Sequence, residues 1–243
     1  EIPTSAKEML SEQHRMHPDI CRVVSHAFYD DKLVDAPSVD RSYLFGDDHA
    51  EFGGRAVVWI DVPHLHWPNG RSTEDEIERD GFSFQNEVEL EVTEQVLLRL
   101  TRTWPQAQSK SDTRVLKLAT ISPYRRQVSR LGSLLRKIDL PAGLGLCERA
   151  AATATAFQGQ EADIAILNLV RNNTGFEMGF LDAPQMNVAL SRARKLMIII
   201  GCFAMLKQKA ESNAPELQFC KRLVQVLAPS VIPAATFIPG VNQ

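Results

Sequence analysis

The sequence predicts an α/β fold in which a parallel sheet is covered by helices on both faces. Several apolar runs lack the polar alternation of a half-exposed strand, which indicates strands that are buried on both sides. Amphipathic helical segments separate these runs, as crossover connections between parallel strands require. The predicted strands are Arg55–Val62, Val115–Ile121, Ile164–Val170 and Leu196–Gly201, and the two long helices are Asn86–Arg102 and Tyr124–Ile138.

The length and composition fit one domain with a large core. The chain has 243 residues, of which 44% are hydrophobic, so we expect a single domain over residues 1–243. Pro18 falls in the first turn of a predicted helix, a position that proline favours. The shorter predicted elements are helices at His17–Tyr29, Asn187–Arg192, 203–209 and 215–227, and a short strand at Ala151–Ala156.

Two polar stretches are predicted to be loops. Residues 30–54 are rich in Asp and Gly, and residues 63–83 combine Pro, Asn, Gly and many acids. We expect the second stretch to be a mobile loop. Its Asp75-Glu76 pair does not end an apolar strand, so we interpret it as solvated charge rather than a metal-binding acidic motif.

The charge and hydropathy exclude some classes of protein. A formal net charge of -3 argues against a protein that grips nucleic acid with its whole surface, so any such contact must be local. No apolar run approaches the ~20 residues that a membrane span needs, and we expect no membrane contact.

The cysteines and histidines carry no metal-site pattern. None of the four cysteines forms a C-x-x-C pair, which favours reduced thiols and a cytoplasmic or nuclear location. The pairs His14 and His17, and His64 and His66, have spacings that some metal sites use. Because no further ligand cluster accompanies them in the sequence, we expect no metal site.

The phosphate-binding motifs of nucleotide enzymes are missing from the sequence. No G-x-x-x-x-G-K-[ST] loop occurs, since Gly is never followed by Lys. No G-x-G-x-x-G follows a strand, which excludes a Rossmann-type dinucleotide enzyme. The chain by itself therefore lacks the backbone cradle for nucleotide phosphates.

Four segments, taken in order, resemble one family of nucleic-acid motors. In chain order they are Ser11–Pro18 (SEQHRMHP), Ile121–Gln127 (ISPYRRQ), Thr153–Asp163 (TATAFQGQEAD) with Val170-Arg171 beyond it, and Gly179–Leu181 with Asn187–Arg194 (NVALSRAR). Together they resemble the second, RecA-like motor domain of superfamily 1B helicases of the nonsense-mediated-decay and senataxin type. The resemblance spans nearly the whole chain and implies a RecA-like fold.

The resemblance implies that ATP and Mg²⁺ lie in a cleft between this domain and an upstream RecA-like domain of the same chain. The upstream domain would hold the phosphates and the metal, and Arg15 and Arg192 match positions that reach the γ-phosphate. Arginine suits this task because its planar fork binds phosphate oxygens and never deprotonates. The alternative for each arginine is a surface ion pair.

Four further residues match nucleotide-binding positions of the family. Gly159 closes a tight turn, and Glu161 would contact the ribose or link it to the motif arginines, although it could instead cap a loop N–H. Gln13 precedes His14, which stands where the family often has a tyrosine that stacks on adenine. An imidazole stacks more weakly, with a charge that depends on pH.

Three residues match positions near the path of single-stranded RNA or DNA: Ser122, Tyr124 and Thr153. Hydroxyls and N–H groups at strand ends suit contacts to the sugar-phosphate backbone, and Arg125 and Arg126 add local positive charge. The alternative for Ser122 and Thr153 is helix capping.

The chain also departs from the family pattern. Thr155 stands where the family often has Asp, and residues 181–186 lack the arginines that usually precede the last motif. Two hypotheses therefore remain: a domain of an active ATP-dependent helicase, and a non-catalytic RecA-like scaffold that binds protein partners. Under either hypothesis we expect the isolated chain to neither hydrolyse ATP nor unwind duplexes.

Overall fold

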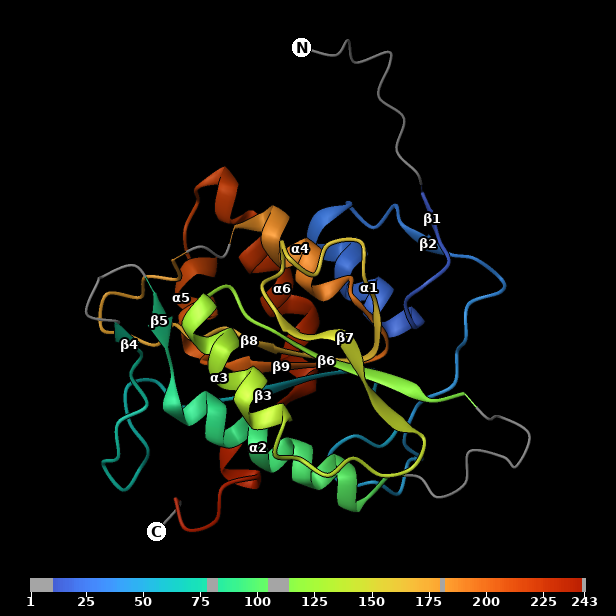
Figure 1. Cartoon of the computed structure of the whole chain (residues 1–243). Coiled ribbons are helices and arrows are strands. Elements are labelled where there is room, and N and C mark those ends of the chain that lie inside the picture. Colours follow the sequence, from blue (N-terminus) through green and yellow to red (C-terminus); the bar gives the residue numbers. More distant parts are fainter. Residues whose placement is uncertain (1–10, 78–82, 105–113, 180–181, 242–243) are drawn as a thin grey trace.

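A parallel sheet forms the centre of the molecule (Figure 1). It has six strands, in the order β10-β3-β9-β8-β6-β7. The computed structural model describes residues 11–77, 83–104, 114–179 and 182–241. The predicted α/β fold with a parallel sheet is confirmed. The strands are β3 (Val57–Asp61), β6 (Leu116–Ile121), β7 (Leu144–Ala152), β8 (Ala162–Asn168), β9 (Ala193–Gly201) and β10 (Val231–Pro233).

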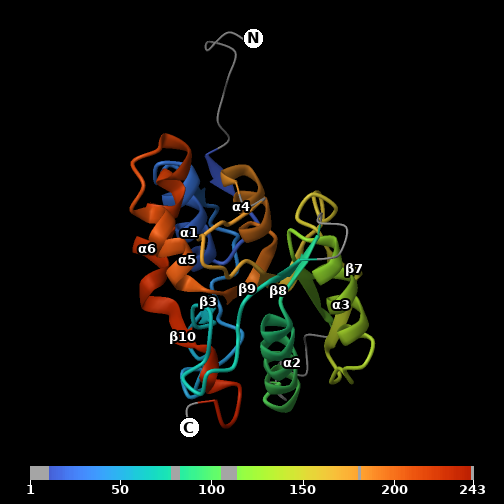
Figure 2. The same ribbon diagram turned by 90° about the vertical axis from the view of Figure 1, so that its left-hand side faces the viewer.

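Helices cover both faces of the sheet (Figure 2). One layer contains α1 (Pro18–Phe28), α4 (Ala183–Leu190), α5 (Phe203–Ala210) and α6 (Gln218–Leu227), and the other contains α2 (Glu87–Arg102) and α3 (Arg125–Leu135). Short 3-10 turns lie at Pro215–Leu217, Ala228–Ser230 and Ala234–Thr236, and two small pairings join β1 (Glu12–Gln13) to β2 (Val34–Asp35) and β4 (Glu76–Ile77) to β5 (Phe84–Gln85). None of the helices in these described ranges is long and apolar enough to cross a membrane.

The sheet separates two hydrophobic cores. Trp59, Leu167 and Ile199 belong to the core under α1, α4, α5 and α6. Their neighbours along the strands, such as Val58 and Ile166, belong to the core under α2. Each such side chain contributes about 1.5–3 kcal/mol when fully buried. This two-sided burial explains why the strand sequences carry no polar alternation.

One predicted strand was misplaced. The strand expected at Ala151–Ala156 is β7, which begins earlier and ends at Ala152. Because β7 is an edge strand, most of its side chains are partly exposed and it includes Glu148 and Arg149. It therefore has no continuous apolar run to reveal it. The edge strand β10 was missed for a similar reason, since it has only three residues and ends in Pro233.

The loop over residues 63–83 is anchored by buried side chains in its described part, 63–77 and 83. Trp67 and Thr73 are 1% and 0% exposed. The interpretation of Asp75 as solvated charge was wrong, because its side chain is only 6% exposed and pairs with Arg171 at 3.1 Å. Its neighbour Glu76 is exposed, as expected. Residues 78–82 lie outside the described residues.

The motif residues divide between opposite ends of the strands. Ser122, Thr153 and Arg171 do follow the carboxyl ends of β6, β7 and β8. Glu161 and Arg192 instead precede the amino ends of β8 and β9. The reason is the early end of β7: residues 153–161 run back across the sheet before β8 begins.

Candidate functional site

The segment that carries Arg15 is a tight turn organised by Gln13. The Gln13 side-chain oxygen accepts hydrogen bonds from the N–H groups of Arg15 and Met16 at 2.8 and 2.7 Å. Its Nε2 donates to the carbonyl of Met16 at 2.8 Å and to Asp35 Oδ1 at 2.6 Å. Gln13 is buried and its amide is occupied within this turn. The Gln13 amide therefore holds the backbone of Arg15 and Met16 in this turn.

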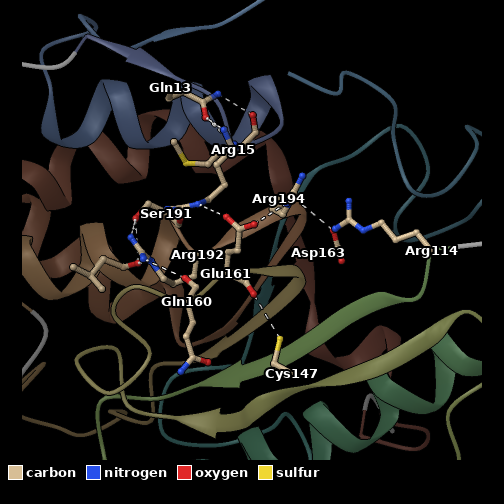
Figure 3. A network of polar contacts seen from close by, with 12 residues as sticks. Gln13, Arg15, Arg114, Cys147, Gln160, Glu161, Asp163, Ser191, Arg192 and Arg194 are labelled. Atoms are coloured by element: carbon tan, nitrogen blue, oxygen red, sulfur yellow. Dashed lines mark hydrogen bonds and ion pairs between the residues drawn. The ribbon is translucent and has the colours of Figure 1, made fainter. Parts of the chain in front are cut away.

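Glu161 lies between two arginines from distant parts of the chain (Figure 3). Its Oε2 accepts a hydrogen bond from Nε of Arg15 at 2.8 Å, and its Oε1 accepts one from Nη1 of Arg194 at 2.7 Å. Burial opposes the charge of this carboxylate, but the hydrogen bonds from Arg15 and Arg194 outweigh that effect and lower the pKa of Glu161. In this structure the Glu161 side chain thus contacts two arginines of the motif segments.

Arg192 is held by oxygen atoms of the backbone and of a hydroxyl. Its Nε donates to the Val188 carbonyl at 2.7 Å, its Nη1 to the Gln160 carbonyl at 3.3 Å, and its Nη2 to Ser191 Oγ at 2.8 Å. No ion pair of Arg192 is found within the described ranges of the chain.

The two predicted phosphate-contacting arginines share a neighbour. Arg15 donates from Nη1 to the Ser191 carbonyl at 3.3 Å, while Arg192 donates to the hydroxyl of the same serine (Figure 3). Burial, followed by the positive charge of Arg15, lowers the pKa of Arg192. The charge of Glu161 acts in the opposite direction on this pKa, without reversing the shift. The pair is thus an electropositive site suited to a phosphate group.

The buried carboxylate of Asp163 lies next to Arg194, the second arginine that binds Glu161. Asp163 is 1% exposed and accepts hydrogen bonds from Arg114 Nη2 at 2.6 Å and from the N–H of Lys117 at 2.8 Å. Arg194 Nε lies 3.8 Å from the same carboxylate. Arg194 therefore spans Glu161 and Asp163, which fixes the carboxylate that in turn holds Arg15.

The other predicted nucleotide residues border the cluster. The imidazole of His14 is exposed, with its Nε2 3.2 Å from Glu12 Oε1. Gly159 has a φ of +83°, as predicted for its turn, and no atom lies within 4 Å of the position that a Cβ would take. His17 is different from His14: it is buried, and its Nδ1 accepts the N–H of Asp19 as the N-cap of α1.

At the carboxyl ends of the strands, two of the predicted track residues are enclosed. Ser122 and Tyr124 are 0% and 2% exposed, and the ring of Tyr124 packs edge-on against Phe84. Thr153 is half-buried, and its hydroxyl accepts the N–H of Ala156 at 3.2 Å, which is a capping role. In this conformation the side chains of Ser122 and Tyr124 are therefore too buried to contact a nucleic acid. The next residue in the chain, Arg125, is exposed.

Sequence reasoning missed a buried polar network behind this edge. It joins the first turn of α2 to the end of β8, and its members are Asn86, Glu89, Thr93, Gln127 and Asn168. Of these residues, only Gln127 could have been found from the sequence, because it closes the I-S-P-Y-x-x-Q segment.

A metal-ligating group of three or more His, Cys, Asp or Glu residues is not found among the residues that the structure describes.

Fold and site together define a class of protein: a RecA-like α/β domain that carries a cluster of arginines but no phosphate loop in its sequence. The chain matches the AAA domain family (AAA_12) over residues 2–204 and belongs to that family. The match agrees with the resemblance to the second motor domain of superfamily 1 helicases.

The curated relatives of the chain bear the names of helicases. It is 29% identical over 213 residues to the DNA polymerase alpha-associated DNA helicase A of Saccharomyces cerevisiae, covering 83% of this chain and 28% of that protein. It is 28% identical over 195 residues to a regulator of nonsense transcripts 1 homolog of Neurospora crassa, covering 79% of this chain and 16% of that protein. With helicase sen1 of Schizosaccharomyces pombe the identity is 31% over 214 residues, covering 82% and 11%. The chain thus spans less than a third of the length of these relatives.

Proposed function

We propose that the chain is the second motor domain of an ATP-dependent helicase that moves on single-stranded RNA or DNA. One observation carries the proposal: Arg192 and Arg15 converge on Ser191, and Arg192 has no ion pair within the described residues. Two guanidinium groups held together in this way would be stabilised by a polyanion. The γ-phosphate of ATP, presented by an upstream RecA-like domain, is such an anion.

In this proposal Arg15 and Arg192 stabilise charge on the transferring phosphoryl group. Both guanidinium groups are already held by hydrogen bonds, so little reorganisation is needed at the moment of reaction. Mg²⁺, when bound by the upstream domain, would neutralise phosphate charge, and the described residues of this chain are not proposed to hold it. His14 would pack against the base, Gly159 would leave room for the nucleotide, and Glu161 would hold Arg15 until phosphate arrives.

The track is proposed to run over the carboxyl ends of β6, β7 and β8. Because Ser122 and Tyr124 are buried, we assign them to shaping this edge, while Thr153 and the exposed Arg125 lie where a sugar-phosphate backbone would pass. The nucleotide-side arginines lie at the amino ends of β8 and β9. ATP and nucleic acid would therefore act on opposite ends of the same strands.

The test is to measure ATP hydrolysis by the full-length protein and by this chain alone, each with and without single-stranded RNA and DNA. The proposal predicts stimulated hydrolysis by the full-length protein and none by the isolated chain. A folded full-length protein that hydrolyses no ATP with either strand would favour the non-catalytic scaffold that binds protein partners.

The four free cysteines fit a reducing location such as the cytoplasm or nucleus.

A further inference from the structure

The chain makes a strained turn where β8 ends. The N–H of Arg171 donates to the Leu169 carbonyl at 2.9 Å, and the residue between them, Val170, has a φ of +73°. This is a three-residue turn in its rare, strained form. A β-branched residue is especially unfavourable at positive φ, and such a residue costs about 1–3 kcal/mol unless its surroundings hold it.

The first turn of α2 holds Val170 from both sides of the residue. Both carboxylate oxygens of Glu89 accept the N–H of Val170, at 2.8 and 2.9 Å. Nδ2 of Asn86 donates to the Val170 carbonyl at 3.1 Å. Asn86 is also the N-cap of α2, and its Oδ1 accepts the N–H of Glu89 at 3.0 Å. The helix start and the strained turn are therefore one hydrogen-bonded unit.

The carboxylate in this unit is in an unfavourable place for a charge. Glu89 is 0% exposed and has no ion pair with any residue that the structure describes, and a charge buried in this way is destabilising. The N-terminal end of α2 offsets part of that penalty. A packed apolar side chain would serve the core at least as well. What Glu89 adds is an acceptor that takes the N–H of a strained residue with both of its oxygens.

The strained turn begins a segment, residues 170–179, that lies at the carboxyl end of the sheet beside the predicted track. Immediately after Val170, Arg171 pairs with Asp75 and lies over the Phe84 ring, 4.0 Å from its centroid. Farther along, Gly179 approaches Tyr124 so closely that a Cβ at Gly179 would lie 2.0 Å from the Tyr124 hydroxyl. Residues 170–179 thus form a segment packed against Tyr124 at the carboxyl end of the sheet.

We propose that Glu89 is a positioning residue: it holds Val170 in the strained turn and so fixes residues 170–179 beside the single-strand track. This inference rests on the proposed function, because the track is part of that proposal. It assigns to the first turn of α2 a part in the binding of nucleic acid, although Glu89 itself is buried and touches none.

The experiment uses Glu89→Gln in the full-length protein, with oligo(dT) and oligo(U) as the probes. Glutamine keeps the size of the side chain but presents only one acceptor oxygen to the Val170 N–H. We expect the oligonucleotide concentration for half-maximal ATPase stimulation to rise on the order of tenfold or more, since small displacements of positioning groups have such effects. Turnover at saturating oligonucleotide should remain near that of the wild type. Glu94→Gln, on an exposed position of the same helix, is the matched control and should change neither quantity.

A second change separates positioning from general damage to the core. Glycine adopts positive φ without strain, so a Val170→Gly background no longer needs the carboxylate. In that background Glu89→Gln should shift half-maximal stimulation by no more than about twofold, the signature of coupled residues. A shift as large as in the wild-type background, in protein that remains folded, would overturn the proposal.

Amide hydrogen exchange tests the same contact without any activity. Glu89→Gln should speed exchange of the Val170 N–H in the full-length protein, whereas Glu94→Gln should not. Unchanged exchange at Val170 would refute the positioning role. If instead exchange responds but neither oligonucleotide stimulates the wild-type ATPase, the proposed helicase function fails while the hold on Val170 stands.

Discussion

The carboxylate of Glu161 accepts a 2.8 Å hydrogen bond from Nε of Arg15, although 146 positions separate the two residues along the chain. The same carboxylate also binds Arg194. It therefore draws together the first and last motif segments at the amino ends of β8 and β9. In the proposed function, a phosphate that enters the site would compete for the same Arg15 N–H groups, and Glu161 would hold that arginine in the absence of nucleotide.

Replacing Glu161 by glutamine should loosen this hold. The neutral amide keeps an acceptor for only one arginine, so Arg15 should lose its fixed orientation. In the full-length protein we expect ATP turnover to fall by roughly tenfold, less than on removal of an arginine that contacts the phosphate directly. Steady-state ATPase assays measure this. Glu148→Gln, on the exposed part of β7, is the control, and equal turnover in wild type and Glu161→Gln would contradict the assignment.

The same pair gives a pH dependence of stability. Because the hydrogen bonds from Arg15 and Arg194 lower the pKa of Glu161 in the folded state, its contribution to the free energy of unfolding is present above its ordinary pKa. That contribution is lost as pH falls through the lowered folded-state pKa. The difference in unfolding free energy between wild type and Glu161→Gln, from denaturant titrations, should therefore shrink below pH of about 4. A difference that stays constant down to acid pH would be inconsistent with the ion pairs. Solvent exposure keeps the effect small.

Gly179 should tolerate no side chain. It has a φ of +62°, and a Cβ there would lie 2.0 Å from the Tyr124 hydroxyl and 3.1 Å from Arg171 Nη1. Gly70 is the matched control, because its φ is +83° but nothing lies within 4 Å of its Cβ position. Both Gly→Ala changes introduce backbone strain, of about 1–2 kcal/mol. Gly179→Ala should destabilise by a further 1–3 kcal/mol or so from overpacking. Equal losses in thermal or chemical unfolding would show that the contact with Tyr124 is not tight.

The thiols should differ in reactivity. Burial raises the pKa of Cys202 to about 12, so only roughly one molecule in ten thousand carries its thiolate near pH 8. Cys21 and Cys220 are buried as well, while Cys147 is half-buried with a raised pKa caused first by burial and then by Asp163. Titration with a disulfide reagent should label Cys147 slowly in the native protein and the other thiols only after unfolding. Rapid native labelling of Cys202 would contradict the packing around it.

The parallel sheet could be predicted because its inner strands are buried on both sides. Each of β3, β6, β8 and β9 carries an apolar run that neither a loop nor a half-exposed strand would need. The edge strand β7 lacked this signal, and the sequence therefore misplaced it. Sequence patterns report burial well, but they report the direction in which a connection runs only indirectly.

The candidate site shows the same division. Motif order made Arg15, Glu161 and Arg192 candidates for the site. In the structure Arg15 and Arg192 both contact Ser191, and Arg15 also contacts Glu161. Partners that depend on tertiary contact were invisible. Glu89 lies on an amphipathic helix among glutamates that are half-buried or exposed, and nothing local marks it as the acceptor for Val170. Asp75 looked like loop charge because its partner Arg171 is 96 positions away.

The most direct test of the proposed function is the ATPase rate of the full-length Arg192→Ala protein with single-stranded RNA or DNA present. Loss of a transition-state arginine should reduce turnover on the order of a thousand-fold, with only a modest change in nucleotide binding. Arg192→Lys should recover little, because an ammonium cannot reproduce the planar fork. Turnover equal to that of the wild type in a folded Arg192→Ala protein would contradict the account.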